Sequence, residues 1–160
     1  DEDVTPGPTI AATTDDAALL ASLPGPDDLP DVGANPGIAG FLRNGAELRR
    51  TAGERSVPDC AWVRLRVPVV AGEPVRTTSL VGMSMDCVNL IGITGLPARV
   101  TAINPDVSSH VVRPPRGEWA GLVGDTRFAH GIGHGFSAAT MVDADGVFGV
   151  TSTSQVVQRH

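Results

Sequence analysis

Asp86 is the acidic residue whose surroundings are least expected in this sequence. It lies within the apolar segment 78–92, TSLVGMSMDCVNLIG, which contains no basic residue that could pair with it. Moving a carboxylate out of water costs several kcal/mol unless it is hydrogen-bonded or faces a cavity. Two roles are therefore open for Asp86: an acid on an exposed helix edge, or a general base that orients water at the mouth of a pocket.

Other reactive side chains point less clearly to chemistry. His130 and His134 are four residues apart, a spacing that could ligate zinc from a helix, but three glycines lie within residues 130–135. These glycines indicate a bend or a β-bulge, and no third ligand follows at a recognisable spacing, so no metal and no cofactor is expected. Cys87 follows Asp86 in an apolar setting, which predicts a raised pKa and a packing role.

Two arginines could bind a phosphate group. Arg113 and Arg116 flank Pro114-Pro115, and a guanidinium group suits phosphate because its N–H donors form a planar fork. The alternative is that both side chains are solvated at the end of a strand.

The elements that must position these residues are mainly strands. Residues 60–70 (CAWVRLRVPVV) alternate between apolar and polar positions, as in a half-buried strand, and residues 41–50 are its expected antiparallel partner. Segment 78–92 has apolar residues three to four apart, which predicts a helix wrapped by other structure. Further strands are expected at 98–103, 108–112, 119–126, 136–142 and 149–158, with a hairpin turn at Asp145-Gly146. Without an alternating βαβ pattern, this order predicts an α+β fold with one helix on an antiparallel sheet.

The charge is unevenly distributed along the 160 residues. Eight of the 18 acids and none of the 12 arginines lie in residues 1–31. Residues 1–36 therefore read as an acidic, proline-rich linker or arm, with one short helix starting at Asp15-Asp16, and residues 37–160 as a single domain. The net charge of −6 argues against nucleic acid as a partner. No apolar run reaches the roughly 20 residues of a membrane span, and a cytoplasmic location is expected because no export signal is recognisable.

An ordered set of short motifs resembles a known family. The set comprises Asp86 with Asn89 and the segments 70–74 (VAGEP), 103–106 (INPD), 113–119 (RPPRGEW), 125–128 (DTRF), 131–133 (GIG) and 143–146 (DADG). Together, over residues 67–159, they resemble the C-terminal half of the thioesterase-like superfamily, actinobacterial relatives of acyl-CoA thioesterase II. The resemblance implies a hotdog fold, in which a curved antiparallel β-sheet wraps around one central α-helix. It also implies pairing, because members usually carry two such domains: a homodimer or a second hotdog domain is expected, with acyl-CoA at the seam.

The same resemblance implies catalytic residues. The family has an acid on the helix, which corresponds to Asp86, and a polar residue that opens the next strand, which corresponds to Asn104. The third position is a glutamine on the last strand. An ungapped placement puts Thr153 or Ser154 there, with Gln155 one residue further. The choice matters because a shift of one residue on a strand turns the side chain to the opposite face.

The implied reaction is hydrolysis of an acyl-CoA thioester by a positioned water molecule. Asp86 would accept the proton while Asn104 and Thr153 or Gln155 hold the water. Backbone N–H groups near residues 79–81 could bind the oxyanion.

Two other functions stay open. The chain could be a catalytically inactive hotdog that acts as an acyl-binding or assembly module. A dehydratase of the related hydratase branch would need a histidine about five residues after its aspartate, where Asp86 has Ile91.

Overall fold

The computed structural model describes residues 14–32, 41–51, 59–91, 100–129 and 133–159. These residues form a seven-stranded sheet in the order β1-β2-β5-β6-β7-β3, with β4 also paired to β7, and every pairing is antiparallel. The strands are β1 (Ala46–Arg50), β2 (Cys60–Leu65), β3 (Val100–Ile103), β4 (Ser108–Val111), β5 (Trp119–Ala129), β6 (His134–Asp143) and β7 (Gly146–Arg159). The α-helices are α1 (Thr14–Ala21), α2 (Phe41–Asn44) and α3 (Thr77–Asp86). None of the helices in these ranges is long and apolar enough to cross a membrane.

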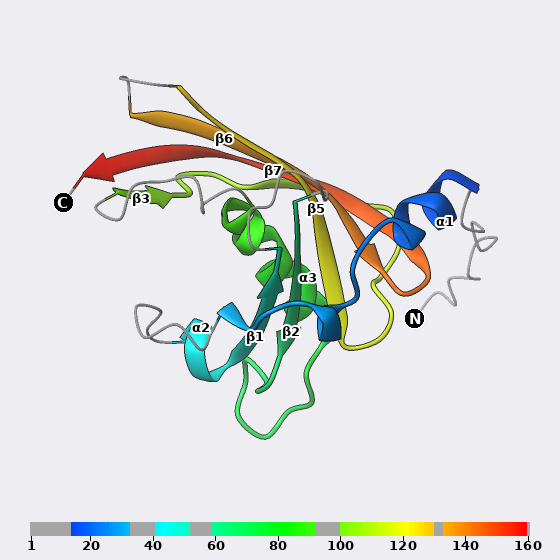
Figure 1. Cartoon of the computed structure of the whole chain (residues 1–160). Coiled ribbons are helices and arrows are strands. Elements are labelled where there is room, and N and C mark those ends of the chain that lie inside the picture. The colour runs from blue at the N-terminus through cyan, green and yellow to red at the C-terminus, as the bar shows by residue number, and fades with distance from the viewer. Residues whose placement is uncertain (1–13, 33–40, 52–58, 92–99, 130–132, 160) are drawn as a thin grey trace, which may run out of the picture.

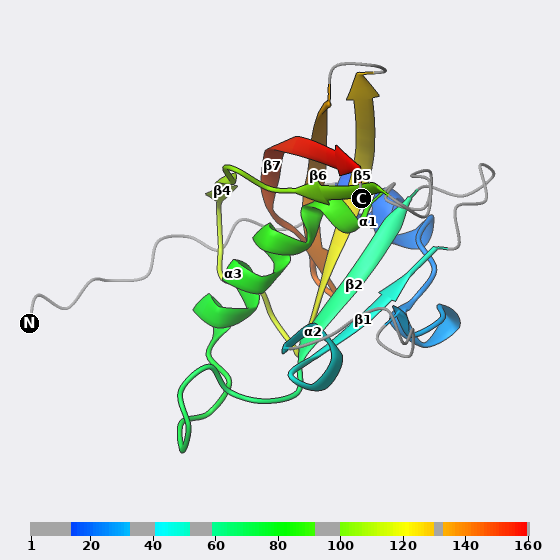
Figure 2. The same ribbon diagram turned by 90° about the vertical axis from the view of Figure 1, so that its left-hand side faces the viewer.

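The sheet curves around α3, which lies along its inner side (Figures 1 and 2). Leu80, Val88 and Ile91 recur at helical spacing and are buried against inward-facing residues of the strands, among them Val63, Leu122, Met141 and Phe148. This arrangement confirms the predicted fold: one helix enclosed by an antiparallel sheet. Burial of these side chains holds the two layers together.

The sequence-based boundaries differ from the structure at two helices. The predicted helix 78–92 is α-helical only from Thr77 to Asp86, and a 3-10 turn, η3 (Cys87–Leu90), continues it. Asp86 therefore lies at the end of α3 and not in its middle. Residues 41–44, predicted as part of the first strand, form α2, and the strand begins at Ala46. The hairpin predicted at Asp145-Gly146 is confirmed, since Asp143 pairs with Gly146, whose φ is +124°.

The N-terminal segment packs on the outer face of the sheet. Buried Leu29 contacts a cluster that includes Trp62 and Val142, and the Trp62 indole Nε1–H donates to the Pro24 carbonyl at 3.0 Å. The alternation along β2 therefore misleads on one point, because Trp62, on the face expected to be solvated, is covered. The domain boundary at residue 37 stays a prediction, but residues 14–32 clearly contribute to packing.

A buried carboxylate connects this segment to the sheet. Glu47 has only 4% of its side chain exposed, and it accepts hydrogen bonds from Arg49 at 2.6 and 2.9 Å and from Arg64 at 2.5 Å. Arg66 lies 3.3 Å from both Glu47 and Asp31. The hydrogen bond from Arg64 is the largest cause of a shift that lowers the pKa of Glu47 to about 2, although burial acts in the opposite direction.

Glu47→Gln is expected to lower the free energy of unfolding at pH 7. The lowering of its pKa from 4.5 to about 2 corresponds to roughly 3 kcal/mol. A carboxyl whose pKa is depressed by folding contributes fully above about pH 4.5, and the contribution disappears as the pH falls toward 2. Urea unfolding of both proteins at pH 7 and pH 3 measures this difference, which should be smaller at pH 3.

The matched control is Glu118→Gln. Glu118 also pairs with Arg64, at 3.3 Å, but 78% of its side chain is exposed, so its loss should change the stability by less than about 1 kcal/mol. Equal effects of the two substitutions would contradict the role given to Glu47.

Candidate functional site

Asn104 and the end of α3 meet directly. The Asn104 Nδ2–H donates to the backbone carbonyl of Asp86 at 2.9 Å. This contact fixes the Asn104 amide beside the backbone of Asp86, where α3 passes into η3. The side chain of Asp86 is exposed.

The last strand turns Thr153 and Gln155 to the inner side. Both are buried, each with 1% of its surface exposed, whereas Ser154 between them is exposed. The Thr153 hydroxyl contacts the backbone carbonyls of Asp106 and Ser154, and the Ser154 side chain hydrogen-bonds to the Asp106 carboxylate. Among the three last-strand positions considered from the sequence, Gln155 therefore combines an inward direction with an amide.

Gln155 belongs to a buried polar chain that crosses three strands. Its Nε2–H donates to Ser137 Oγ at 2.7 Å, and Ser137 Oγ lies 2.6 Å from Thr126 Oγ1. The Thr126 hydroxyl donates to the backbone carbonyl of Ile91, which directly follows η3. No role was predicted for Ser137 or for Thr126, although Thr126 lies within the motif 125–128. Their one signal is the presence of hydroxyl side chains at inward positions of β6 and β5, where alternation predicts apolar residues.

Two amide oxygens in this region have no hydrogen-bond partner among the described residues. They are Asn104 Oδ1 and Gln155 Oε1, and both atoms are buried. The register of β3 against β7 ends with Ile103 opposite Val156, so Asn104 follows next to Gln155. An unpaired buried acceptor is costly, so each of these oxygens is suited to a donor such as water.

Arg113 is held inside the fold. It makes a two-pronged ion pair with the fully buried Asp143, at 2.7 and 2.8 Å, and donates to the Gly146 carbonyl at 2.9 Å. Burial alone would raise the pKa of Asp143, but Arg113 and the backbone N–H groups of Arg116 and Asp145 outweigh it and lower that pKa. Arg116 pairs through its side chain with Asp145 at 3.0 Å. These contacts connect the 113–116 loop to the β6–β7 turn, and substrate binding by the two arginines stays a prediction.

The remaining reactive residues are less prominent in the structure. Cys87 is buried, and burial together with Asp86 raises the pKa of its thiol, as the sequence predicted. His134 is exposed, and His130 lies outside the described residues. Within the described ranges, no group of three or more histidine, cysteine or acidic side chains is arranged as metal ligands.

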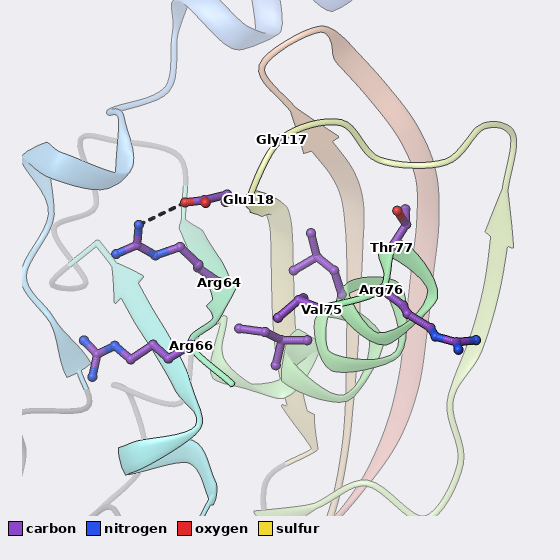
Figure 3. A pocket seen from close by; sticks show the side chains of 9 residues that line it. Arg64, Arg66, Val75, Arg76, Thr77, Gly117 and Glu118 are labelled. Atoms are coloured by element: carbon purple, nitrogen blue, oxygen red, sulfur yellow. Dashed lines mark hydrogen bonds and ion pairs between the residues drawn. The ribbon is translucent and has the colours of Figure 1, made fainter. Parts of the chain in front are cut away.

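A cavity of about 430 Å³ opens at the other end of α3. Figure 3 shows Val75 in this cavity, between the Arg64–Glu118 pair and Thr77. α3 has ten residues, so its first and last residues are about 14 Å apart. The backbone N–H groups of Ser79 and Leu80 donate to the Arg76 carbonyl, at 3.0 and 3.2 Å. The oxyanion donors expected at residues 79–81 are thus engaged in part, and they lie five to seven residues before Asp86, about 8 to 11 Å along the helix.

Fold and site together define a hotdog protein with a polar site at the end of its helix. A family model for the acyl-CoA thioesterase C-terminal domain matches residues 15–157. The chain therefore belongs to the acyl-CoA thioesterase C-terminal domain family, as its motifs suggested. No curated protein matches it in sequence.

Solved structures support the fold. An acyl-CoA thioesterase II from Mycobacterium marinum is similar with a TM-score of 0.59 at 16% identity, over 86% of this chain and 55% of that one. A hot dog fold protein of unknown function from Alicyclobacillus acidocaldarius has a TM-score of 0.55 at 13% identity, over 98% of this chain and 58% of that one. A putative thioesterase from Syntrophus aciditrophicus has a TM-score of 0.50 at 13% identity, over 74% of this chain and 87% of that one. The chain thus spans little more than half the length of the first two.

Replacement of Arg113 tests its structural role. Arg113→Ala would leave the fully buried Asp143 carboxylate without its ion pair, and the expected loss is about 3 kcal/mol of unfolding free energy. Arg116→Ala is the control, because that pair is about half exposed or more and should contribute less than about 1 kcal/mol. Chemical denaturation measures both. An Arg113→Ala protein of normal stability that binds acyl-CoA weakly would instead support the phosphate-binding prediction.

Proposed function

We propose that the chain hydrolyses an acyl-CoA thioester with a water molecule held at the end of α3. The observation that carries this proposal is the pair of buried, unpartnered amide oxygens on Asn104 and Gln155. Each amide is anchored through its nitrogen, to the Asp86 carbonyl and to Ser137 respectively, so each presents its oxygen to the site. Membership in the acyl-CoA thioesterase C-terminal domain family supports the choice of substrate.

The chemistry follows from what two acceptors do to water. A water molecule that donates one hydrogen to the amide oxygens of Gln155 and Asn104 and the other to the Asp86 carboxylate keeps its lone pairs free for attack on the thioester carbonyl carbon. Asp86 then accepts the proton that the water loses as the new C–O bond forms. The tetrahedral intermediate collapses with cleavage of the C–S bond, and the thiolate of CoA leaves. Thr153, whose hydroxyl contacts two backbone carbonyls, has a supporting role in this scheme and does not hold the water.

Asp86→Asn tests the assignment of the base. Loss of a general base costs about 10²- to 10⁴-fold in rate, so kcat should fall by that factor while the fold is kept, because the side chain is exposed. Thiol release from acyl-CoAs of increasing chain length measures the activity. The matched control is Asp125→Asn, an exposed aspartate on β5 that pairs with Arg127 at 2.9 Å, and it should retain full activity.

The same experiment addresses the alternative function. A wild-type protein without turnover, whose melting temperature acyl-CoA still raises, would be an acyl-binding module. Undiminished hydrolysis by Asp86→Asn would refute Asp86 as the base. The sequence-based expectations of a cytoplasmic location and of acyl-CoA as the partner stay predictions until then.

We also propose that a second hotdog domain pairs with the edge formed by β3 and β4. Three apolar side chains at this edge are exposed: Ile103 at 49%, Val111 at 45% and Val112 at 68%. An exposed apolar strand edge favours pairing with another strand. The partner is a second copy of this chain, and a separate hotdog domain is the alternative.

Sedimentation velocity tests this pairing. We expect a dimer that Val112→Lys weakens at least tenfold in affinity, because the substitution puts a charge into the apolar contact. Val70→Lys is the control, since Val70 is also exposed, at 53%, but lies in the loop after β2. A protein that stays monomeric at high micromolar concentration would exclude self-pairing and leave the separate hotdog domain.

A further inference from the structure

The polar chain from Gln155 to Ile91 has a direction that hydrogen counting determines. The backbone carbonyl of Ile91 can only accept a hydrogen bond, so the Thr126 hydroxyl must donate its one hydrogen to it. Thr126 can then only accept from Ser137, whose oxygen lies 2.6 Å away. The Ser137 hydroxyl donates its hydrogen to Thr126, so it can only accept from Gln155, at 2.7 Å. The side of the Gln155 amide that faces Ser137 must therefore be the NH₂ group.

This direction matters for the other side of the same amide. A glutamine side chain has two orientations of similar shape, which exchange its NH₂ group and its oxygen. With the NH₂ group fixed on Ser137, the oxygen faces away from Ser137 and is the buried, unpartnered Oε1. In the reversed orientation the NH₂ group would donate to the water and engage one of its two lone pairs, and the amide could no longer accept a hydrogen from the water.

We infer that Thr126 and Ser137 are positioning residues that set the polarity of the Gln155 amide. The inference rests on the proposed function, because it concerns the water-holding oxygen of that site. Its physical basis is burial: Ser137 has no exposed surface and Gln155 has 1%, so water cannot replace either partner in the contact between these two side chains. The terminal acceptor, the Ile91 carbonyl, lies directly after η3 and five residues after Asp86, so the segment that follows α3 also orients Gln155.

The inference makes an unusual prediction about two substitutions. Thr126→Val keeps the shape of the side chain but removes the acceptor for Ser137. The Ser137 hydroxyl can then donate to the Gln155 oxygen and favour the reversed amide. Ser137→Ala removes the contact altogether and lets both orientations form. Thr126→Val, although more distant from Gln155, should therefore be the more harmful change.

Steady-state kinetics of four proteins tests this order. We expect Thr126→Ser, which keeps the hydroxyl, to have the kcat of the wild type. Ser137→Ala should lose about 2- to 5-fold in kcat, and Thr126→Val about 10- to 100-fold. KM should stay within about twofold, because the affected interaction holds water and not substrate. A loss in Ser137→Ala that equals or exceeds that in Thr126→Val, or full activity of Thr126→Val, would overturn the inference.

A measurement without turnover separates this inference from the proposed function. In the wild-type protein, nuclear Overhauser effects should connect the Gln155 side-chain NH₂ hydrogens with the Ser137 methylene group, and Thr126→Val should weaken them. Melting temperatures identify any variant that has lost its fold. If the wild type hydrolyses no thioester, the proposed function fails, and the NMR comparison alone decides the inference. Unchanged Overhauser effects in Thr126→Val would then refute it.

Discussion

The structure depends on how the carbonyl groups at the end of α3 are satisfied. The helical segment formed by α3 and η3 ends against the curved sheet, and side chains from the sheet side contact its backbone. Asn104, which follows β3, donates to the carbonyl of Asp86, and Thr126 on β5 donates to the carbonyl of Ile91, which follows η3. Both contacts connect the helix to the strands, and both have a further effect on an amide. Asn104 is anchored directly, and Gln155 through Ser137. The candidate site is thus a consequence of the packing of one helix end.

Arginine serves the fold in a comparable way at two other places. Glu47 on β1 and Asp143 on β6 are buried carboxylates, and each is paired with arginine. A guanidinium group suits this task because it donates several hydrogen bonds in a plane and stays charged when partly buried. A lone buried carboxylate would oppose folding. Together, the pairs stabilise the outer surface near β1 and the turn between β6 and β7.

The sequence predicted the architecture better than it predicted the site. Periodic apolar residues identified α3, and alternation identified most strands, because burial on one side of an element leaves a regular pattern. The pattern could not reveal that Trp62 is covered by residues from the N-terminal segment, since that contact joins positions 38 apart in the chain. For the same reason the pattern could not reveal the ion pair of Arg113, because its partner Asp143 lies 30 residues away.

The sequence alone could not determine which residue of the last strand, β7, faces the helix. Thr153, Ser154 and Gln155 are adjacent, and only the register of β7 determines which of them face the helix. The pairings Ile103 with Val156 and Ser108 with Ser152 differ by one residue in register, so one extra residue lies between β3 and β4. No local pattern reports such an insertion. No role was predicted for Ser137 or Thr126, because single hydroxyl residues are common in strands and become informative only once their hydrogen bonds are known.

The two unpartnered amide oxygens are buried while Asp86 is exposed. A second hotdog domain that covered Asp86 would exclude bulk water from the proposed site, and pairing would then be connected to the proposed chemistry.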